Sequence, residues 1–179
     1  MTYSDTMKNV NSLFPKRSIR PLLILALVFF AAMPSQSAEI ISIQPQDAPD
    51  ACSARSAQVR VTVTNVKSGG ALNIELYDDP DNFLFKKGRK RKVRVPAIAG
   101  QQTACINLAQ PGTYAVAVYQ DMDGDRKLKK NWNLLPLEPF GLSNNPEQYT
   151  GFPKFSDSAF TTGKLGADIV INLQPPPKP

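Results

Sequence analysis

The sequence predicts an all-β protein: an antiparallel β-sandwich of about seven strands with one long irregular loop. Apolar and polar residues alternate over several short segments, which is typical of strands with one buried face. Glycine, proline and asparagine separate these segments, and no segment has the apolar spacing of an amphipathic helix. The 16 prolines suit loops and sheet edges better than helices. Together these features indicate short strands joined by turns.

Four segments carry the clearest strand pattern. QVRVTVT (58–64) alternates valine with polar residues, and LNIELY (72–77) alternates in the same way. TYAVAVYQD (113–121) is more apolar, so we expect it near the middle of a sheet, and ADIVINL (167–173) is the last strand. Weaker patterns occupy residues 39–44, 92–98 and 103–108. Seven strands of this length fit an immunoglobulin-like or prealbumin-like sandwich.

Residues 1–38 have the features of a secretory signal peptide. An apolar run, PLLILALVFFAAM (21–33), is followed by the small residues of PSQSA (34–38). The basic residues that precede the run are Lys8, Lys16, Arg17 and Arg20. The run is shorter than the roughly 20 residues that a spanning helix needs. We therefore expect export, with cleavage after Ser37 or Ala38; an uncleaved anchor is the alternative.

Export would leave a single domain over residues 39–174 and a proline-rich, disordered tail over 175–179. We expect it in the periplasm or outside the cell, with no stable transmembrane span after processing. No cysteine closely follows the apolar run, which argues against a lipoprotein. These are expectations from the leader pattern.

Charge and composition exclude several functions. The chain has 21 basic and 15 acidic residues, a net charge of +6, but without residues 1–38 the charge falls to +3. Nucleic-acid binding therefore loses most of its support. The chain has no histidine, the commonest general base and transition-metal ligand. The usual hydrolase, phosphate-loop and zinc-protease motifs are also absent from the sequence. We predict that the protein is not an enzyme.

The two cysteines, Cys52 and Cys105, are expected to form a disulfide, because an even number of cysteines in an exported protein favours pairing. Such a bond would stabilise the fold by roughly 4 kcal/mol in the chain-entropy model. Two separate thiols are the alternative.

The stretch QDMDGDRKL (120–128) is a candidate calcium loop. Asp121, Asp123 and Asp125 alternate as in the first positions of a calcium-binding loop, and Glu138 is the most plausible remote ligand. Ca²⁺ is thus the possible metal, and no other cofactor is expected. The alternative is a turn whose aspartates cap backbone amides. In that case nearby basic residues balance the charge: Arg126, Lys127, Lys129 and Lys130.

A basic run follows the second predicted strand. Its residues are Lys86, Lys87, Arg89, Lys90, Arg91, Lys92 and Arg94. Alternation places Lys92 and Arg94 opposite Val93 and Val95, so we expect both to face water. The run could bind phosphates, acidic glycans or anionic lipid. Alternatively it is a solvated hairpin arm that protects an edge strand, partly neutralised by nearby aspartates.

The long stretch from Asp125 to Ser158 has little strand pattern and four aromatic residues. A loop of this length in a compact domain is usually functional or packed on its own side chains. Its aromatic residues are Trp132, Phe140, Phe152 and Phe155. They either pin the loop against the sandwich or form a binding surface.

Three motifs in this order resemble the bacterial family known as domain of unknown function 2141. They are PGTYAVAVYQDMDGDRKL (111–128), LPLEPFGLSNN (135–145) and PKFSDSAF (153–160). The resemblance extends over residues 59–173 and implies a small, exported, β-rich domain with no established activity. Family members typically carry a glycine and an acidic residue where this chain has Arg126 and Lys129. A lysine ammonium could therefore occupy the place of a cation.

These features favour an exported, non-enzymatic module that binds or scaffolds in the cell envelope. Its partner would be an envelope component or an anionic glycan or lipid, and not nucleic acid. One alternative is a hydrolase or transferase that uses the carboxylates near Asp121 and Glu138. Another is a structural domain stabilised by calcium.

Overall fold

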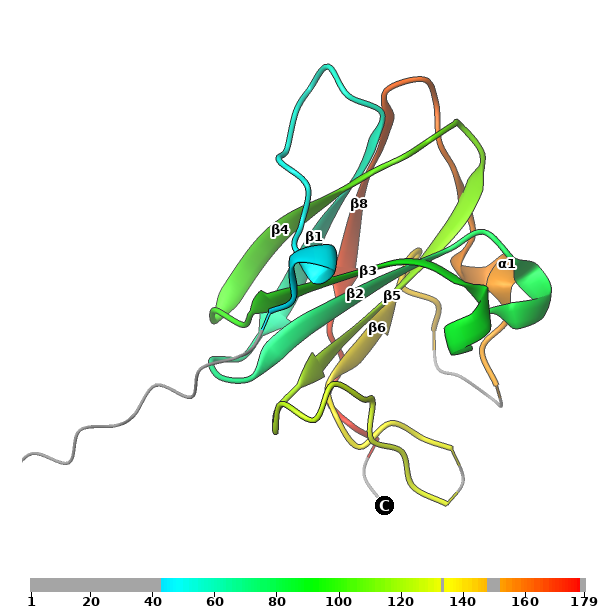
Figure 1. Cartoon of the computed structure of the whole chain (residues 1–179). Coiled ribbons are helices and arrows are strands. Elements are labelled where there is room, and N and C mark those ends of the chain that lie inside the picture. Colours follow the sequence, from blue (N-terminus) through cyan, green and yellow to red (C-terminus); the bar gives the residue numbers. More distant parts are fainter. Residues whose placement is uncertain (1–42, 133, 148–151, 178–179) are drawn as a thin grey trace, which may run out of the picture. The chain divides into compact units, whose positions relative to one another are not determined.

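The computed structural model describes residues 43–132, 134–147 and 152–177 (Figure 1). The predicted signal peptide and residues 39–42 of the first predicted strand lie outside the described residues. Residues 43 and 44 are not in a strand. Within the described part, no helix has the length and apolar character to cross a membrane.

The described strands form two sheets. The first has the order β4 (Gly100–Asn107), β1 (Gln58–Val66), β8 (Gly166–Asn172). The second has the order β3 (Arg89–Pro96), β2 (Ala71–Tyr77), β5 (Thr113–Asp121), β6 (Phe140–Leu142), and β7 (Phe160–Thr161) also pairs with β5. The helical elements are short: η1 (Pro45–Asp47), η2 (Pro80–Asn82), η3 (Lys86–Gly88) and α1 (Phe155–Ser158). The all-β prediction is confirmed.

One pairing differs from the predicted antiparallel arrangement. Strand β8 pairs in parallel with β1, so that Gly166 lies opposite Gln58 and Asn172 opposite Thr64. Alternation of apolar residues reports which face is buried but not the direction of the neighbouring strand. The long connection between β6 and β8 lets the chain return beside β1 in the same direction. Strands β6 and β7 were not predicted because two or three residues are too few to show a period.

An apolar core lies between the two sheets. Strand β1 contributes Val59, Val61 and Val63, all fully buried. Their partners from the second sheet include Leu72, Ile74, Leu76, Val93, Val116 and Val118. These are the apolar positions of the alternating segments. Burying each side chain contributes on the order of 1.5–3 kcal/mol, which makes this core the main source of stability.

The other face of the second sheet is covered as well. A second apolar cluster contains Tyr77, Phe83, Ala115, Ala117, Tyr119, Phe140 and Leu142. Strand β5 is therefore buried on both faces from its second residue onward, as its apolar composition predicted. The connections before β3, after β5 and after β6 supply the covering residues Phe83, Leu84, Leu128 and Phe155 (Figure 1). This second layer is where the candidate site described below lies.

The predicted disulfide is present. Cys52 and Cys105 are bonded, with their Cα atoms 5.3 Å apart. The bond fastens the segment before β1 to strand β4, next to the backbone bridge between Asp50 and Cys105.

Candidate functional site

The structure brings three of the four predicted metal ligands together. Carboxylate oxygens of Asp121, Asp123 and Glu138 all lie within 4.8 Å of one another. Asp125 is not part of this group; its Oδ1 instead accepts the Lys127 amide at 2.8 Å. The fourth residue proposed from sequence therefore caps the turn.

The grouped carboxylates bind the backbone of their own loop. Asp121 Oδ1 accepts the amide of Gly124 and Oδ2 that of Arg126, both at 2.8 Å. Glu138 accepts the amides of Met122 at 2.9 Å and Lys129 at 3.1 Å, one on each oxygen. Burial raises the pKa of Glu138, while these two amide bonds oppose the shift. The aspartates thus act as turn caps.

Two basic side chains neutralise this loop. Lys129 forms an ion pair with Asp123, and this contact lowers the pKa of Asp123 and raises that of Lys129. Arg94 donates to Asp121 Oδ2 at 2.6 Å. The Arg126 side chain forms an ion pair with Asp47. With two cations and its own amides around it, the carboxylate group is a poor fit for Ca²⁺, which needs six to eight free oxygen ligands.

The predicted exposure of Arg94 is wrong. The residue is 1% exposed, and Lys92 is half-buried. Both lie on the side of β3 opposite Val93, as alternation predicted, but the second layer covers that side. Arg94 can be buried because the carboxylate of Asp121 and the amide oxygen of Asn73, 3.0 Å away, replace its water. It therefore cannot belong to a surface anion patch.

The remaining basic run divides into two groups, apart from Lys87, which is exposed and belongs to neither. Lys90 forms an ion pair with Asp78, and Arg91 donates to the carbonyls of Gln46 and Ala48. The other group, Lys86, Arg89 and Lys92, lines a pocket. The run is therefore not one continuous patch.

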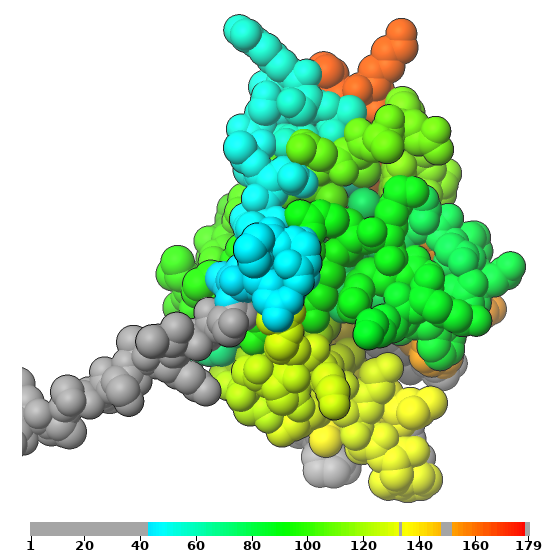
Figure 2. All heavy atoms as spheres, in the orientation of Figure 1, coloured from blue at the N-terminus to red at the C-terminus, as the bar shows by residue number. Residues whose placement is uncertain are grey.

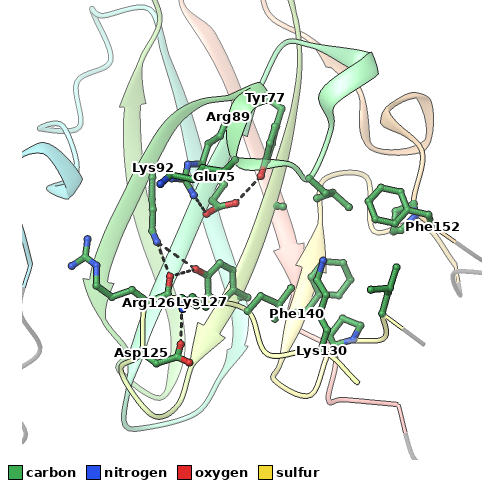
Figure 3. A pocket seen from close by; sticks show the side chains of 18 of the residues that line it. Glu75, Tyr77, Arg89, Lys92, Asp125, Arg126, Lys127, Lys130, Phe140 and Phe152 are labelled. Carbon is green, nitrogen blue, oxygen red and sulfur yellow. Dashed lines mark hydrogen bonds and ion pairs between the residues drawn. The ribbon is translucent and has the colours of Figure 1, made fainter. Parts of the chain in front are cut away.

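That pocket has a volume of about 760 Å³ and lies on the outer face of the second sheet (Figure 3). Its floor consists of outward-facing residues from four adjacent strands: Glu75, Tyr77, Arg89, Lys92, Ala117, Tyr119 and Phe140. Its rim comes from η1, from the connection after β2 and from the long loop after β5. The pocket therefore depends on segments far apart in the sequence.

Hydrogen bonds fix the polar groups on this floor. Glu75 accepts from the Tyr77 hydroxyl at 2.6 Å and forms an ion pair with Arg89. The pKa of Tyr77 is raised, first by burial and then by the Glu75 charge, so its hydroxyl stays protonated and donates. The two contacts hold the Glu75 carboxylate in a fixed position, and the Arg89 guanidinium balances its charge.

Lys92 has a different environment. Its Nζ lies 3.3 Å from the Tyr119 hydroxyl and 3.4 Å from the Arg126 carbonyl, both neutral groups (Figure 3). Within the described part of the chain it forms no ion pair. Burial is the main cause that lowers the pKa of Lys92. The charges of Arg89 and Arg126 lower this pKa further, while those of Glu75 and Asp47 raise it. An anion at this position would form the direct ion pair that the ammonium does not make among the described residues.

The lining has a basic part and an apolar part. Its basic residues are Lys86, Arg89, Lys92, Arg126, Lys127 and Lys130, against three acidic ones, Asp47, Glu75 and Asp125. Its apolar part includes Leu84, Leu128, Leu134, Leu135, Pro136, Phe140, Phe152 and Pro153. Such a pocket can hold a molecule with an anionic end and an apolar body.

Sequence reasoning did not find this pocket. For Glu75, Tyr77 and Tyr119 the only local signal is the alternation that places them on the outer side of their strands. Strand pairing makes them neighbours, because Glu75 lies opposite Lys92 on one side and Ala117 on the other. Of the aromatic residues in the long loop, Phe140 and Phe152 line the pocket.

The fold and pocket define a class: an all-β domain whose second sheet carries an amphipathic pocket on its outer face. The chain belongs to the family described as an uncharacterised protein conserved in bacteria (DUF2141), whose model matches residues 61–169. Comparisons with curated proteins and with solved structures gave no match.

Proposed function

We propose that the protein is an exported, non-enzymatic binding module, an immunoglobulin-like or prealbumin-like sandwich whose pocket takes an amphiphilic anion. The ligand would have a carboxylate or phosphate head and an apolar body. The observation that carries this proposal is the half-buried ammonium of Lys92, which faces neutral partners at the floor of the pocket. A charged group in such a place is costly unless an opposite charge joins it.

The size of the pocket supports this ligand class. Sites for small molecules typically have volumes of roughly 300–1,000 Å³ and mostly apolar walls with a few polar groups. The volume of about 760 Å³ and the leucine, proline and phenylalanine residues of the lining fit this description. The basic residues around Lys92 favour a negative head group. The disulfide supports the exported location, because such bonds persist in oxidising compartments.

The enzyme alternative has less support. Asp121 and Glu138 are buried and already accept backbone amides, and neither lines the pocket within the described residues. General acid–base work needs a carboxyl group within reach of a substrate proton. This arrangement favours binding over catalysis by these two residues.

Titration calorimetry with decanoate tests the proposal. Acetate carries the same head without the body, and octyl glucoside carries an apolar tail with a neutral head. We expect decanoate to bind most tightly. Lys92→Gln should weaken decanoate binding by about tenfold or more, because a hydrogen bond to a charged group contributes roughly 1.5–3 kcal/mol.

The matched control is Lys164→Gln, an exposed lysine between β7 and β8 that does not line the pocket. It should leave decanoate affinity unchanged, and a thermal melt should show both variants folded. Equal affinity for decanoate and octyl glucoside, or a Lys92→Gln affinity equal to that of the unmodified protein, would rule out the ammonium as the anion site.

A further inference from the structure

We infer that the loop after β5 carries a second functional surface, which docks on an anionic lipid bilayer. This surface is the apolar finger, defined as residues 129–132 and 134–137. The inference rests on the finger's own structure, exposure and charge, and does not depend on the ligand proposed for the pocket.

The apolar finger is an ordered projection. Its two sides are joined at the base by the bond from the Leu137 amide to the Lys129 carbonyl, 2.8 Å, and by the bridge between Lys130 and Pro136. Asn131 closes the turn, because its amide donates to the Leu135 carbonyl and its side-chain oxygen accepts the Leu135 amide, both at 2.9 Å. In Figure 1 this yellow segment extends from the end of β5 away from the two sheets, and in Figure 2 it stands out at the lower edge.

Large apolar side chains project from this structure into solvent. Trp132 is 89% exposed, Leu134 64% and Leu137 53%, and Leu135 is exposed beside them. Single exposed apolar residues are ordinary, but four on one short projection indicate a contact surface. Tryptophan is enriched where proteins meet the membrane–water interface, since its ring is apolar and its indole N–H stays hydrated.

The charge beside the finger favours a membrane with anionic lipids. Lys127, Lys129 and Lys130 are all exposed at its base. Lys129 is paired with Asp123, but within the described residues no ion pair is formed by Lys127 or Lys130. Lysines next to projecting apolar residues are attracted to anionic head groups while the apolar residues enter the interface. A projecting tip suits a bilayer surface better than a protein partner, which would need a matching groove.

Docking would also bring the pocket to the membrane. Lys127, Lys130, Leu134 and Leu135 belong to the lining of the pocket as well as to the finger or its base. The pocket opening is thus beside the surface where amphiphilic anions are found.

Trp132 is the single tryptophan of the chain, so its fluorescence reports on the finger directly. This matters because the apolar run 21–33 of the full chain can itself bind vesicles, whereas tryptophan emission reports only on residue 132. The probes are vesicles of phosphatidylcholine alone and of phosphatidylcholine mixed with phosphatidylglycerol, each also prepared with brominated acyl chains. We expect a blue shift and bromine quenching of Trp132 with the mixed vesicles, both weakened by added salt.

Leu137→Ser keeps the tryptophan and changes a finger residue that does not line the pocket. It should weaken the Trp132 response to mixed vesicles by about tenfold, the factor expected for losing one buried leucine side chain. Leu165→Ser is the matched control: Leu165 is 58% exposed and lies just before β8, outside the finger. It should leave the response unchanged.

Decanoate binding separates this inference from the proposed function. Leu137→Ser should retain decanoate affinity, and Lys92→Gln should retain the Trp132 response. Emission that does not change with mixed vesicles would overturn the inference, as would an equal response to phosphatidylcholine alone. A blue shift in buffer that grows with protein concentration would also overturn it, because a second copy of the chain would then cover the finger.

Discussion

Arg94 and Asp121 form a buried ion pair across the second sheet. Arg94 Nη1 lies 2.6 Å from Asp121 Oδ2, and the side chains are 2% and 0% exposed. The same nitrogen lies 3.0 Å from the Asn73 side-chain oxygen on the intervening strand β2. The pair therefore connects β3 to the end of β5 through β2, and it supplies the positive charge beneath the aspartate loop.

We expect Arg94→Met to destabilise the fold strongly. It would leave the Asp121 carboxylate buried without its cation, and breaking a buried pair typically costs 3–5 kcal/mol, so a loss of about that size is expected. Urea unfolding measures the free energy of unfolding. The control is Arg60→Met, which breaks the more exposed pair with Asp168 and should cost about 1 kcal/mol or less. Equal losses of unfolding free energy in the two variants would show that burial does not make the Arg94 pair more important for stability than the exposed pair.

The disulfide should contribute measurably to stability. Cys52 and Cys105 are separated by 53 positions, and closing a loop of that length stabilises the fold by about 4 kcal/mol in the chain-entropy model. Thiol counting on denatured, unreduced protein should find no free sulfhydryl. The double variant Cys52→Ser with Cys105→Ser should unfold at a lower urea concentration. Its free energy of unfolding should be lower by about the same 4 kcal/mol. Two free thiols in protein recovered from an oxidising compartment would contradict the pairing.

Calcium should leave the melting temperature unchanged. The oxygens of Asp121 and Glu138 accept backbone amides, and Lys129 neutralises Asp123. Lys129→Asp should create a calcium response, because it removes the internal cation and adds an oxygen ligand near Asp123. A bound ion would then raise stability by RT ln(1 + [Ca²⁺]/Kd), about 2.7 kcal/mol at a hundredfold excess over Kd.

The control for this charge reversal is Lys164→Asp, at an exposed position outside the loop. Differential scanning calorimetry with Ca²⁺ and with a chelator gives the measurement. If the unmodified protein melts higher in Ca²⁺ and Asp123→Ala loses the increase, the loop holds a metal ion in spite of its lysine.

Decanoate affinity should fall at alkaline pH, earlier than an ordinary lysine would allow. Burial, aided by Arg89 and Arg126, lowers the pKa of Lys92. The ammonium that binds the carboxylate is charged below this pKa and neutral above it, so affinity is retained at lower pH and lost as pH rises through it. Calorimetry across the alkaline range should show the loss in the unmodified protein. In Lys92→Gln this alkaline loss of affinity should be absent. If Lys92→Gln loses affinity over the same pH range as the unmodified protein, another group is responsible for the loss.

The strand pattern could be predicted because it is local. In β1 the valines 59, 61 and 63 alternate with polar residues, and a strand turns successive side chains to opposite faces whatever its neighbours are. The boundaries of β1, β2, β5 and β8 therefore followed from the sequence to within a residue or two. The pairing of Cys52 with Cys105 followed from their number and the predicted export. Backbone capping by the aspartates was one of two alternatives that the sequence left open, the other being a calcium site.

The site could not be predicted, because it depends on which strands become neighbours. Nothing in the basic run distinguishes Arg94, which is buried beside Asp121, from Lys90, which pairs at the surface with Asp78. That difference arises when β2 lies between β3 and β5 and the long loop covers their outer face. The parallel pairing of β8 with β1 is likewise set by the path of the connecting chain. Sequence by itself determined which residues face the same side of each strand; the tertiary structure decided what covers that side, because burial and charge pairing depend on segments that meet only when the chain is folded.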